Sequence, residues 1–341
     1  MPYALHQAGF GLGLLLLLAV AVITDYSLVI MVRAAHISGD FTYQGIMRAA
    51  FGQPGFILLS ILQFIYPYIA MVSYNIVVGD TVTKVLVRLT GMAPDSVFAH
   101  REVVTLLATF LITLPLCLHR DVTKLARVSF LSLLFVAAIL LAIIARAPAM
   151  APLVPPTEDA WQFANSDVVP AIGIMAFAFM CHHNTFLIYE SMAQANQKRW
   201  DTVTHISVGT SAFVTFVFGI VGYATFTSWS QGDLLENYCW GDDLMNAARL
   251  IFSATILLTY PIECFVARDV LRSTVLANLP DTRVLHVALT LALLPAVATA
   301  LFGATVAIVG TVMLVLHFST ASECSHGAIM SYCMIHTNAT D

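Results

Sequence analysis

Long apolar runs without a formal charge alternate with short polar segments along most of the chain. Because a helix rises ~1.5 Å per residue, about 20 apolar residues cross the ~30 Å hydrocarbon core of a bilayer. The pattern predicts nine spanning helices, at about residues 11–33, 54–79, 103–118, 128–145, 168–189, 202–228, 244–267, 284–302 and 303–317. Residues 1–10 are too short to cross alone, and the polar segments 34–53 and 148–165 are predicted to be loops. An all-α, polytopic membrane protein is expected.

The fifth predicted span carries an unusual polar run in its second half. Asp167 and Glu190 bracket it, and no Asp, Glu, Lys or Arg lies between them. The polar run consists of Cys181, His182, His183, Asn184 and Thr185. Five such side chains in a row cannot all face lipid, because an unpaired polar group there costs on the order of several kcal/mol. The run therefore indicates either a helix broken at a wet cavity or an unbroken helix whose polar stripe packs on its neighbours.

Composition supports the prediction of a membrane protein and argues against several classes of function. Only 10% of the residues are charged, against about 25% in soluble domains, and the mean hydropathy is +0.84. The net charge of −5 gives no reason to expect a nucleic-acid partner. The six cysteines show no metal-ligand spacing and indicate no disulfide framework. No signal peptide, phosphate loop, nucleophile elbow or metalloprotease motif is recognisable, so neither secretion nor an enzyme is predicted.

The distribution of Lys and Arg predicts the orientation in the membrane. If the first span runs from outside to inside, ten basic residues lie inside: Arg33, Arg48, Arg120, Lys124, Arg127, Lys198, Arg199, Arg268, Arg272 and Arg283. Five lie outside: Lys84, Arg88, Arg101, Arg146 and Arg249. The excess of positive charge inside favours this orientation. With nine spans, it places the N-terminus outside and the C-terminal tail inside.

Ionisable and hydroxyl side chains within the spans are candidates for function. His182 and His183 point ~100° apart on a helix; one packed histidine and one facing a cavity is favoured over direct substrate contact. Thr255 and Thr259 lie one turn apart, next to a proline, and their oxygens suit a hard monovalent cation such as sodium. The alternative is that each threonine bonds to its own helix.

Two acidic residues are candidates for function because they lie deep within predicted spans. Asp25 lies within the first span, and Glu263 lies within the seventh. Asp80, Glu190 and Arg249 are predicted to be interfacial.

Several motifs resemble the sodium-coupled neutral amino acid transporters of the amino acid/auxin permease branch. Residues 1–10, MPYALHQAGF, resemble their LPYAxxQAGF segment, and residues 177–184, FAFMCHHN, resemble their FAFxCH run. Residues 258–261, LTYP, resemble the TxP of their eighth helix. The resemblance covers about residues 1–301, and the three motifs taken together are specific to this family.

The resemblance implies a LeuT-like fold of eleven helices in two inverted repeats. Substrate would lie between broken helices one and six, and sodium between helices one and eight. The residues expected to bind substrate are Tyr74, Asn75, Phe179, Cys181, His182, His183 and Asn184. Those expected to bind sodium are Thr255 and Thr259, with sodium as the coupling ion and no other metal or cofactor. The expected partners are a neutral amino acid, sodium and the lipid bilayer.

The chain also departs from the family pattern. It begins after the Gly-rich break of helix one, and the match fades beyond about residue 302, so helix eleven is absent. We therefore expect an incomplete transporter domain at 1–318 and a divergent polar tail at 319–341, as in a shortened isoform from alternative splicing or a fragment. The predicted function is secondary, sodium-coupled uptake of neutral amino acids at the plasma membrane. The alternative is a transport-inactive membrane scaffold; a receptor is a weaker third possibility.

Overall fold

The computed structural model describes residues 1–91, 96, 100–119, 126–158, 160–280, 282–294 and 330–333, and within them every regular element is helical. The helices are α1 (Pro2–Ala8), α2 (Phe10–Ser38), α3 (Tyr43–Thr90), α4 (Arg101–Ala108), η2 (Thr109–Thr113), α5 (Leu114–Cys117), α6 (Ala126–Met150), α7 (Val168–Ala178), η4 (His182–Asn184), α8 (Thr185–Ser191), α9 (Gln197–Phe226), η5 (Thr227–Trp229), η6 (Leu234–Asn237), α10 (Asp243–Thr274) and α11 (Arg283–Leu293). The prediction of an all-α membrane protein is confirmed.

Six helical stretches of the described chain are long and apolar enough to cross a membrane. They are Phe10–Ser38, Tyr43–Thr90, Ser129–Met150, Val168–Ser191, Gln197–Trp229 and Asp243–Thr274. The predicted third span appears as the shorter apolar stretch Glu102–Cys117, and the predicted eighth begins as Arg283–Leu293. The end of the eighth span and the whole of the ninth, 303–317, lie outside the described residues.

The predicted loop at 34–53 is wrong, because most of it is helical. Helix α2 continues to Ser38 and ends at Gly39, whose φ of 75° is left-handed. Thr42 caps the next helix by accepting a hydrogen bond from the Gly45 backbone N–H at 3.0 Å. Gly52, with φ 68° and ψ −159°, then divides α3 into two helical segments. Residues 34–53 have the polar composition of a loop because this short segment lies at the end of the bundle.

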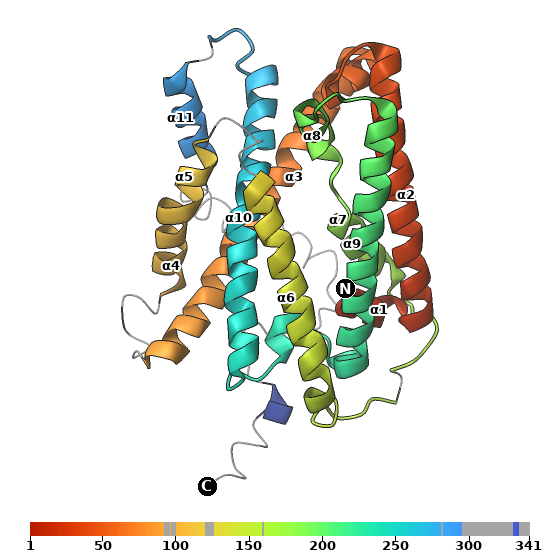
Figure 1. Cartoon of the computed structure of the whole chain (residues 1–341), viewed down its shortest axis with the longest axis vertical. Coiled ribbons are helices and arrows are strands. Elements are labelled where there is room, and N and C mark those ends of the chain that lie inside the picture. Colours follow the sequence, from red (N-terminus) through yellow and green to blue (C-terminus); the bar gives the residue numbers. More distant parts are fainter. Residues whose placement is uncertain are drawn as a thin grey trace, which may run out of the picture.

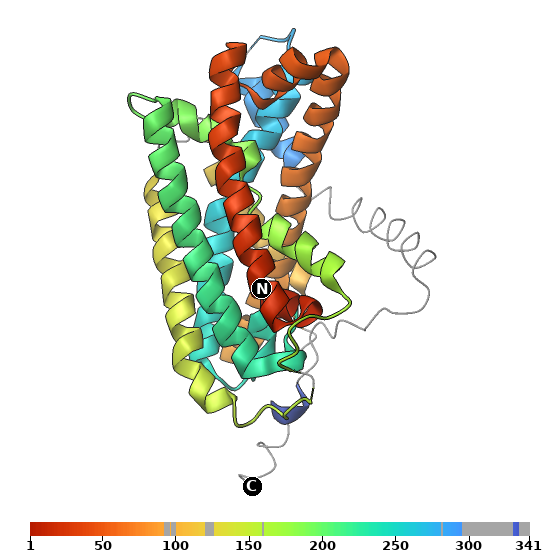
Figure 2. The ribbon, with the colours of Figure 1, turned by 90° about the vertical axis from the view of Figure 1, so that its right-hand side faces the viewer.

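Helix α10 lies in the middle of the bundle (Figure 1). Its apolar window is 56% buried, against 11% for α6, because α10 packs along both α3 and α6. Helices α4, α5 and α11 lie on one side of it, and α2, α7 and α9 lie on the other. Figure 2 shows the short helix α1 at the foot of α2, where its buried residues pack with α7 and α9.

A disulfide between Cys239 and Cys333 joins two segments 94 residues apart, so the expectation of no disulfide framework is wrong. Tyr332 strengthens the junction by donating a hydrogen bond to the Asn237 carbonyl at 2.7 Å. Residues 330–333 therefore lie at the end of the bundle where α10 begins, which is the predicted outside (Figure 1). The prediction that the tail lies inside is wrong for this segment, because it depended on the number of spans.

Candidate functional site

The polar run of the fifth span interrupts the helix, as one of the two sequence interpretations predicted. Helix α7 ends at Ala178, an irregular segment follows, and η4 leads into α8. At the break, the Asn184 N–H donates to the Cys181 carbonyl at 3.1 Å, which closes a tight turn instead of an α-helical one. The break thus frees peptide groups from α-helical hydrogen bonding within a membrane-length stretch and places polar side chains beside them.

The two histidines of the break contact different helices. His182 is half-buried, and its Nε2 lies 2.6 Å from the Ser27 hydroxyl of α2. His183 is buried, and its Nε2 lies 3.0 Å from the Glu263 carboxylate of α10. The adjacent histidines therefore connect the break to two different helices, α2 at one side of the bundle and the central α10.

Helix α3 presents polar side chains to the same break. Gln63 donates to the His183 carbonyl at 3.4 Å, and the Tyr66 hydroxyl donates to the Met180 carbonyl at 3.5 Å. The Tyr66 ring also packs 4.7 Å from the His183 ring. Both distances are long for hydrogen bonds, so these carbonyls are only weakly satisfied. Neither Gln63 nor Tyr66 is among the site residues expected from the sequence.

Tyr74 and Asn75 lie further along α3. Tyr74 packs 6.3 Å from the Tyr260 ring of α10 and is near enough to Glu263 to interact with it electrostatically. Asn75 is 4% exposed. The structure thus brings Tyr74 to the side of the break that faces α10 and encloses Asn75 in the bundle.

The two threonines expected to bind sodium both bond to their own helix. Thr255 donates to the Ile251 carbonyl at 2.9 Å, and Thr259 donates to the Thr255 carbonyl at 2.6 Å. This is the alternative arrangement recognised from the sequence. A hydroxyl that donates in this way keeps its oxygen lone pairs, so the arrangement still leaves acceptor sites on α10.

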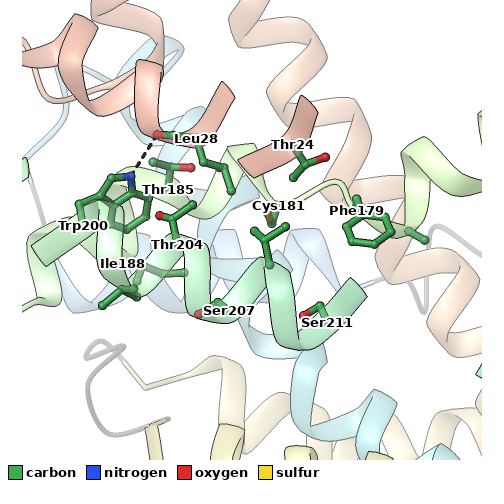
Figure 3. Close-up of a pocket in the computed structure, with 13 residues that line it drawn as sticks. Thr24, Leu28, Phe179, Cys181, Thr185, Ile188, Trp200, Thr204, Ser207 and Ser211 are labelled. Carbon is green, nitrogen blue, oxygen red and sulfur yellow. Dashed lines mark hydrogen bonds between the residues drawn. The ribbon is translucent and has the colours of Figure 1, made fainter. Parts of the chain in front are cut away.

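A cavity of about 270 Å³ lies behind the break, between α2 and α9 (Figure 3). It is lined by Thr24, Leu28, Ala178, Phe179, Cys181, Thr185, Ile188, Trp200, Val203, Thr204, Ser207, Val208 and Ser211. Of the residues expected to bind substrate, only Phe179 and Cys181 line this cavity. The break therefore has two faces, one toward this cavity and one, with His183, toward α3 and α10.

The remaining ionisable candidates lie away from the break. Asp25 pairs with His205 of α9 at 2.8 Å, in a partly exposed position. Arg249, predicted to be interfacial, is only 4% exposed and donates to the carbonyls of Leu235 and Tyr238, each at 2.7 Å. Glu190 is exposed on α8. Of the two acidic residues highlighted from the sequence, only Glu263 joins the break.

Three consecutive residues of the break hold buried polar atoms that have no hydrogen-bond partner within the described chain. They are His183 Nδ1, Asn184 Oδ1 and Thr185 Oγ1. Buried polar groups in folded proteins are nearly always paired, and each unpaired group costs about 1–3 kcal/mol. Their clustering makes the break the candidate site for a polar ligand.

Comparison with known proteins shows which proteins the chain is similar to. Residues 1–318 match the family described as "Transmembrane amino acid transporter protein". The chain is 45% identical over 296 residues to "Putative sodium-coupled neutral amino acid transporter 11" of Danio rerio, covering 87% of this chain and 66% of that protein. It is 47% identical over 267 residues to the Homo sapiens protein of the same name, covering 78% and 66%.

A more distant relative carries a different name. "Vacuolar amino acid transporter 2" of Saccharomyces cerevisiae is 29% identical over 280 residues, which cover 79% of this chain and 57% of the relative. The chain spans less than two thirds of the length of each of these three relatives. All three are named as transporters, which agrees with the expectation that the chain is not an enzyme.

Proposed function

Because the chain belongs to the transmembrane amino acid transporter family, we propose that it transports a neutral amino acid and binds it at the break between α7 and α8. One observation carries the proposal: the unpaired polar atoms of His183, Asn184 and Thr185 lie together at a helix break. An amino acid brings an ammonium group that donates and a carboxylate that accepts hydrogen bonds. Such a zwitterion can satisfy groups of both kinds.

The charges near the break favour a substrate with an uncharged side chain. Glu263 lies 3.0 Å from His183, and the residues expected to bind substrate carry no permanent charge. The carbonyl end of α7, an eleven-residue helix, faces the break and favours an ammonium group. Phe179 and Cys181 border the cavity behind the break and add apolar surface for a side chain.

The proposal includes sodium as the coupling ion, with Thr259 and Thr255 as ligands. The printed names of the relatives at 45% and 47% identity contain the words "sodium-coupled". The oxygen lone pairs of both threonines suit a hard cation. We also propose the plasma membrane as the site of transport, although the yeast relative is named as vacuolar; surface biotinylation tests this location.

Uptake of radiolabelled alanine or glutamine, with and without sodium, tests the function. We expect uptake above background in cells whose plasma membrane contains the chain, and loss of its sodium dependence in Thr259→Val. Thr274→Val is the matched control, because Thr274 makes the same hydrogen bond to the carbonyl four residues earlier, at the far end of α10.

Two results would contradict parts of the proposal. Background uptake by a chain that reaches the surface would exclude transport by this chain and favour the inactive scaffold. Uptake that ignores both sodium and Thr259→Val would retain transport but exclude the proposed sodium site.

A further inference from the structure

We propose that the cavity between α2 and α9 binds one acyl chain of an anionic phospholipid, whose phosphate lies against Lys198 and Arg199 at the start of α9. Two cavities carry the inference. The inner cavity, behind the break, has a volume of about 270 Å³, and an outer cavity of about 630 Å³ lies where α8 leads into α9. Val203 lines both, so the two adjoin. The site does not rest on the proposed function, because a chain that transports nothing would still bind the lipid.

The inner cavity has the lining that an acyl chain requires at the end nearer the start of α9. Figure 3 shows Trp200 and Ile188 at this end and Phe179 at the other. Trp200 is only 4% exposed and contributes a large apolar surface. Ile188 and Val203 are 45% and 42% exposed, so the cavity is open at its side. An apolar hollow that opens at the side of a membrane-spanning bundle is filled more favourably by hydrocarbon than by water.

The outer cavity supplies positive charge at the level of lipid headgroups. Lys198 and Arg199 line it, both are exposed, and neither forms an ion pair within the described residues. Arg199 donates one hydrogen bond to the Ala193 carbonyl at 2.8 Å, which leaves further N–H groups of its guanidinium for a phosphate. Asp201, the nearest acidic residue of α9, is paired with Arg33 at 3.4 Å. This end of the bundle is the predicted cytosolic side, where the membrane surface is rich in anionic lipid.

One buried hydroxyl lies between the positive charge and the apolar lining. Thr204 lines the inner cavity, is 3% exposed, and its Oγ1 has no hydrogen-bond partner in the described part of the chain. It follows Arg199 by about 7.5 Å along α9. This spacing suits an ester carbonyl, which a short glycerol unit separates from the phosphate. Positive charge, a buried donor and an apolar cavity thus follow one another in the order of the groups of a phospholipid.

Other occupants match only part of this order. A sterol or a zwitterionic phospholipid has no net negative charge for Lys198 and Arg199. A free fatty acid carries the charge, but its carboxylate is joined directly to the tail. With that carboxylate at Lys198, the fatty acid offers Thr204 only methylene groups, and a buried hydroxyl stays unpaired. Charge and hydrogen bonding together therefore favour the anionic phospholipid.

Quenching of Trp200 fluorescence by brominated lipids tests the site, because bromine quenches a tryptophan that it touches and Trp200 lines the inner cavity. The chain in nanodiscs of dioleoyl phosphatidylcholine receives increasing fractions of phosphatidylserine or phosphatidylcholine with dibrominated acyl chains. Subtracting the same series for Trp200→Phe isolates the Trp200 signal. We expect brominated phosphatidylserine to bind at least about tenfold more tightly than brominated phosphatidylcholine, since each basic residue near the membrane surface contributes roughly fivefold.

Two variants separate the parts of the site. Lys198→Gln should weaken binding of brominated phosphatidylserine about fivefold. Arg48→Gln removes an exposed charge at the same end of the bundle, outside both cavities, and should change binding less than about twofold. Ser207→Leu narrows the inner cavity and should reduce quenching by both brominated lipids. Thr210→Leu changes an exposed position of α9 that does not line the cavity, and should leave quenching unchanged.

Four results would overturn the proposal. Equal binding of the two brominated phospholipids would exclude recognition of an anionic headgroup. A Trp200 that neither lipid quenches would show that no acyl chain enters the cavity. Stronger quenching by dibromostearic acid than by brominated phosphatidylserine would make a fatty acid the occupant. A loss of binding in Arg48→Gln equal to that in Lys198→Gln would reduce the effect to general surface charge.

Discussion

Arg249 fixes the end of the bundle where α10 begins. It is almost fully buried and donates to two carbonyls of the preceding loop, those of Leu235 and Tyr238. We predict that Arg249→Met lowers the free energy of unfolding by about 2–4 kcal/mol, because these buried acceptors lose their partners. Thermal unfolding in detergent measures the effect.

Arg88→Met is the control for this prediction. Arg88 is exposed near the end of α3 at the same end of the bundle, so its loss should change stability by less than about 0.5 kcal/mol. Equal losses from both variants would mean that the buried hydrogen bonds of Arg249 do not hold the loop.

Residue types in the sequence indicated the break, but not its contacts. The run from Cys181 to Thr185 is visible because consecutive polar side chains cannot face lipid. The contacts of His183 with Glu263 and of His182 with Ser27 join positions far apart in the chain. No local pattern encodes such pairs, since they depend on how α2 and α10 pack around the break.

At the scale of elements, Gly52 allows the sharp turn between the two segments of α3. Its φ of 68° and ψ of −159° lie in a region that essentially only glycine adopts. We predict that Gly52→Ala destabilises the fold by about 1–3 kcal/mol through backbone strain alone. A Cβ there would meet nothing nearer than Pro54 Cδ at 3.9 Å, so crowding contributes little.

Gly173→Ala, within a regular helix, is the control for Gly52→Ala. Gly173 lies inside α7, and a Cβ at this position meets nothing within 4 Å. The substitution should be neutral or stabilising by up to about 1 kcal/mol, because alanine favours the helix. If thermal unfolding shows the two substitutions to be equivalent, the turn at Gly52 does not require glycine.

Apolar runs predicted where most long helices lie, and polar composition misassigned one connection. The charge-free runs correspond to α2, α3, α6, α9 and α10 because lipid requires continuous apolar helices. The prediction of a loop at 34–53 failed because a short helix at the end of the bundle needs no apolar run. Gly39, Thr42 and Gly52 are residue types that often end, cap or interrupt a helix. Only the backbone angles of the structure show that Gly39 ends α2, Thr42 caps α3 and Gly52 divides α3.

At the scale of the molecule, the disulfide and the basic residues predict the same orientation. Disulfides persist in oxidising compartments, so the end that contains Cys239 and Cys333 should face the cell exterior or an organelle lumen. Arg33, Arg48 and Arg199 lie on helical segments at the opposite end, where α2 meets α3 and α9 begins, as expected for a cytosolic side.

Thiol labelling tests this orientation in intact cells. In a Cys181→Ser, Cys324→Ser background, a membrane-impermeant maleimide should react with Cys239 and Cys333 only after mild reduction. Cys333→Ser, the control, should leave Cys239 reactive without reductant. Labelling of both thiols without reductant would exclude the disulfide, and labelling only after permeabilisation would reverse the orientation.

The central claim is that the break between α7 and α8 faces water and binds an amino acid. Cys181 is an exposed thiol at this break, whereas Cys117 and Cys264 are buried. The decisive measurement is the rate at which a membrane-impermeant thiol reagent modifies Cys181 in a variant that retains it as the sole cysteine. We predict rapid modification that is slowed severalfold by alanine or glutamine. A Cys181 that stays unmodified from both aqueous phases, or whose modification no neutral amino acid slows, would contradict the account.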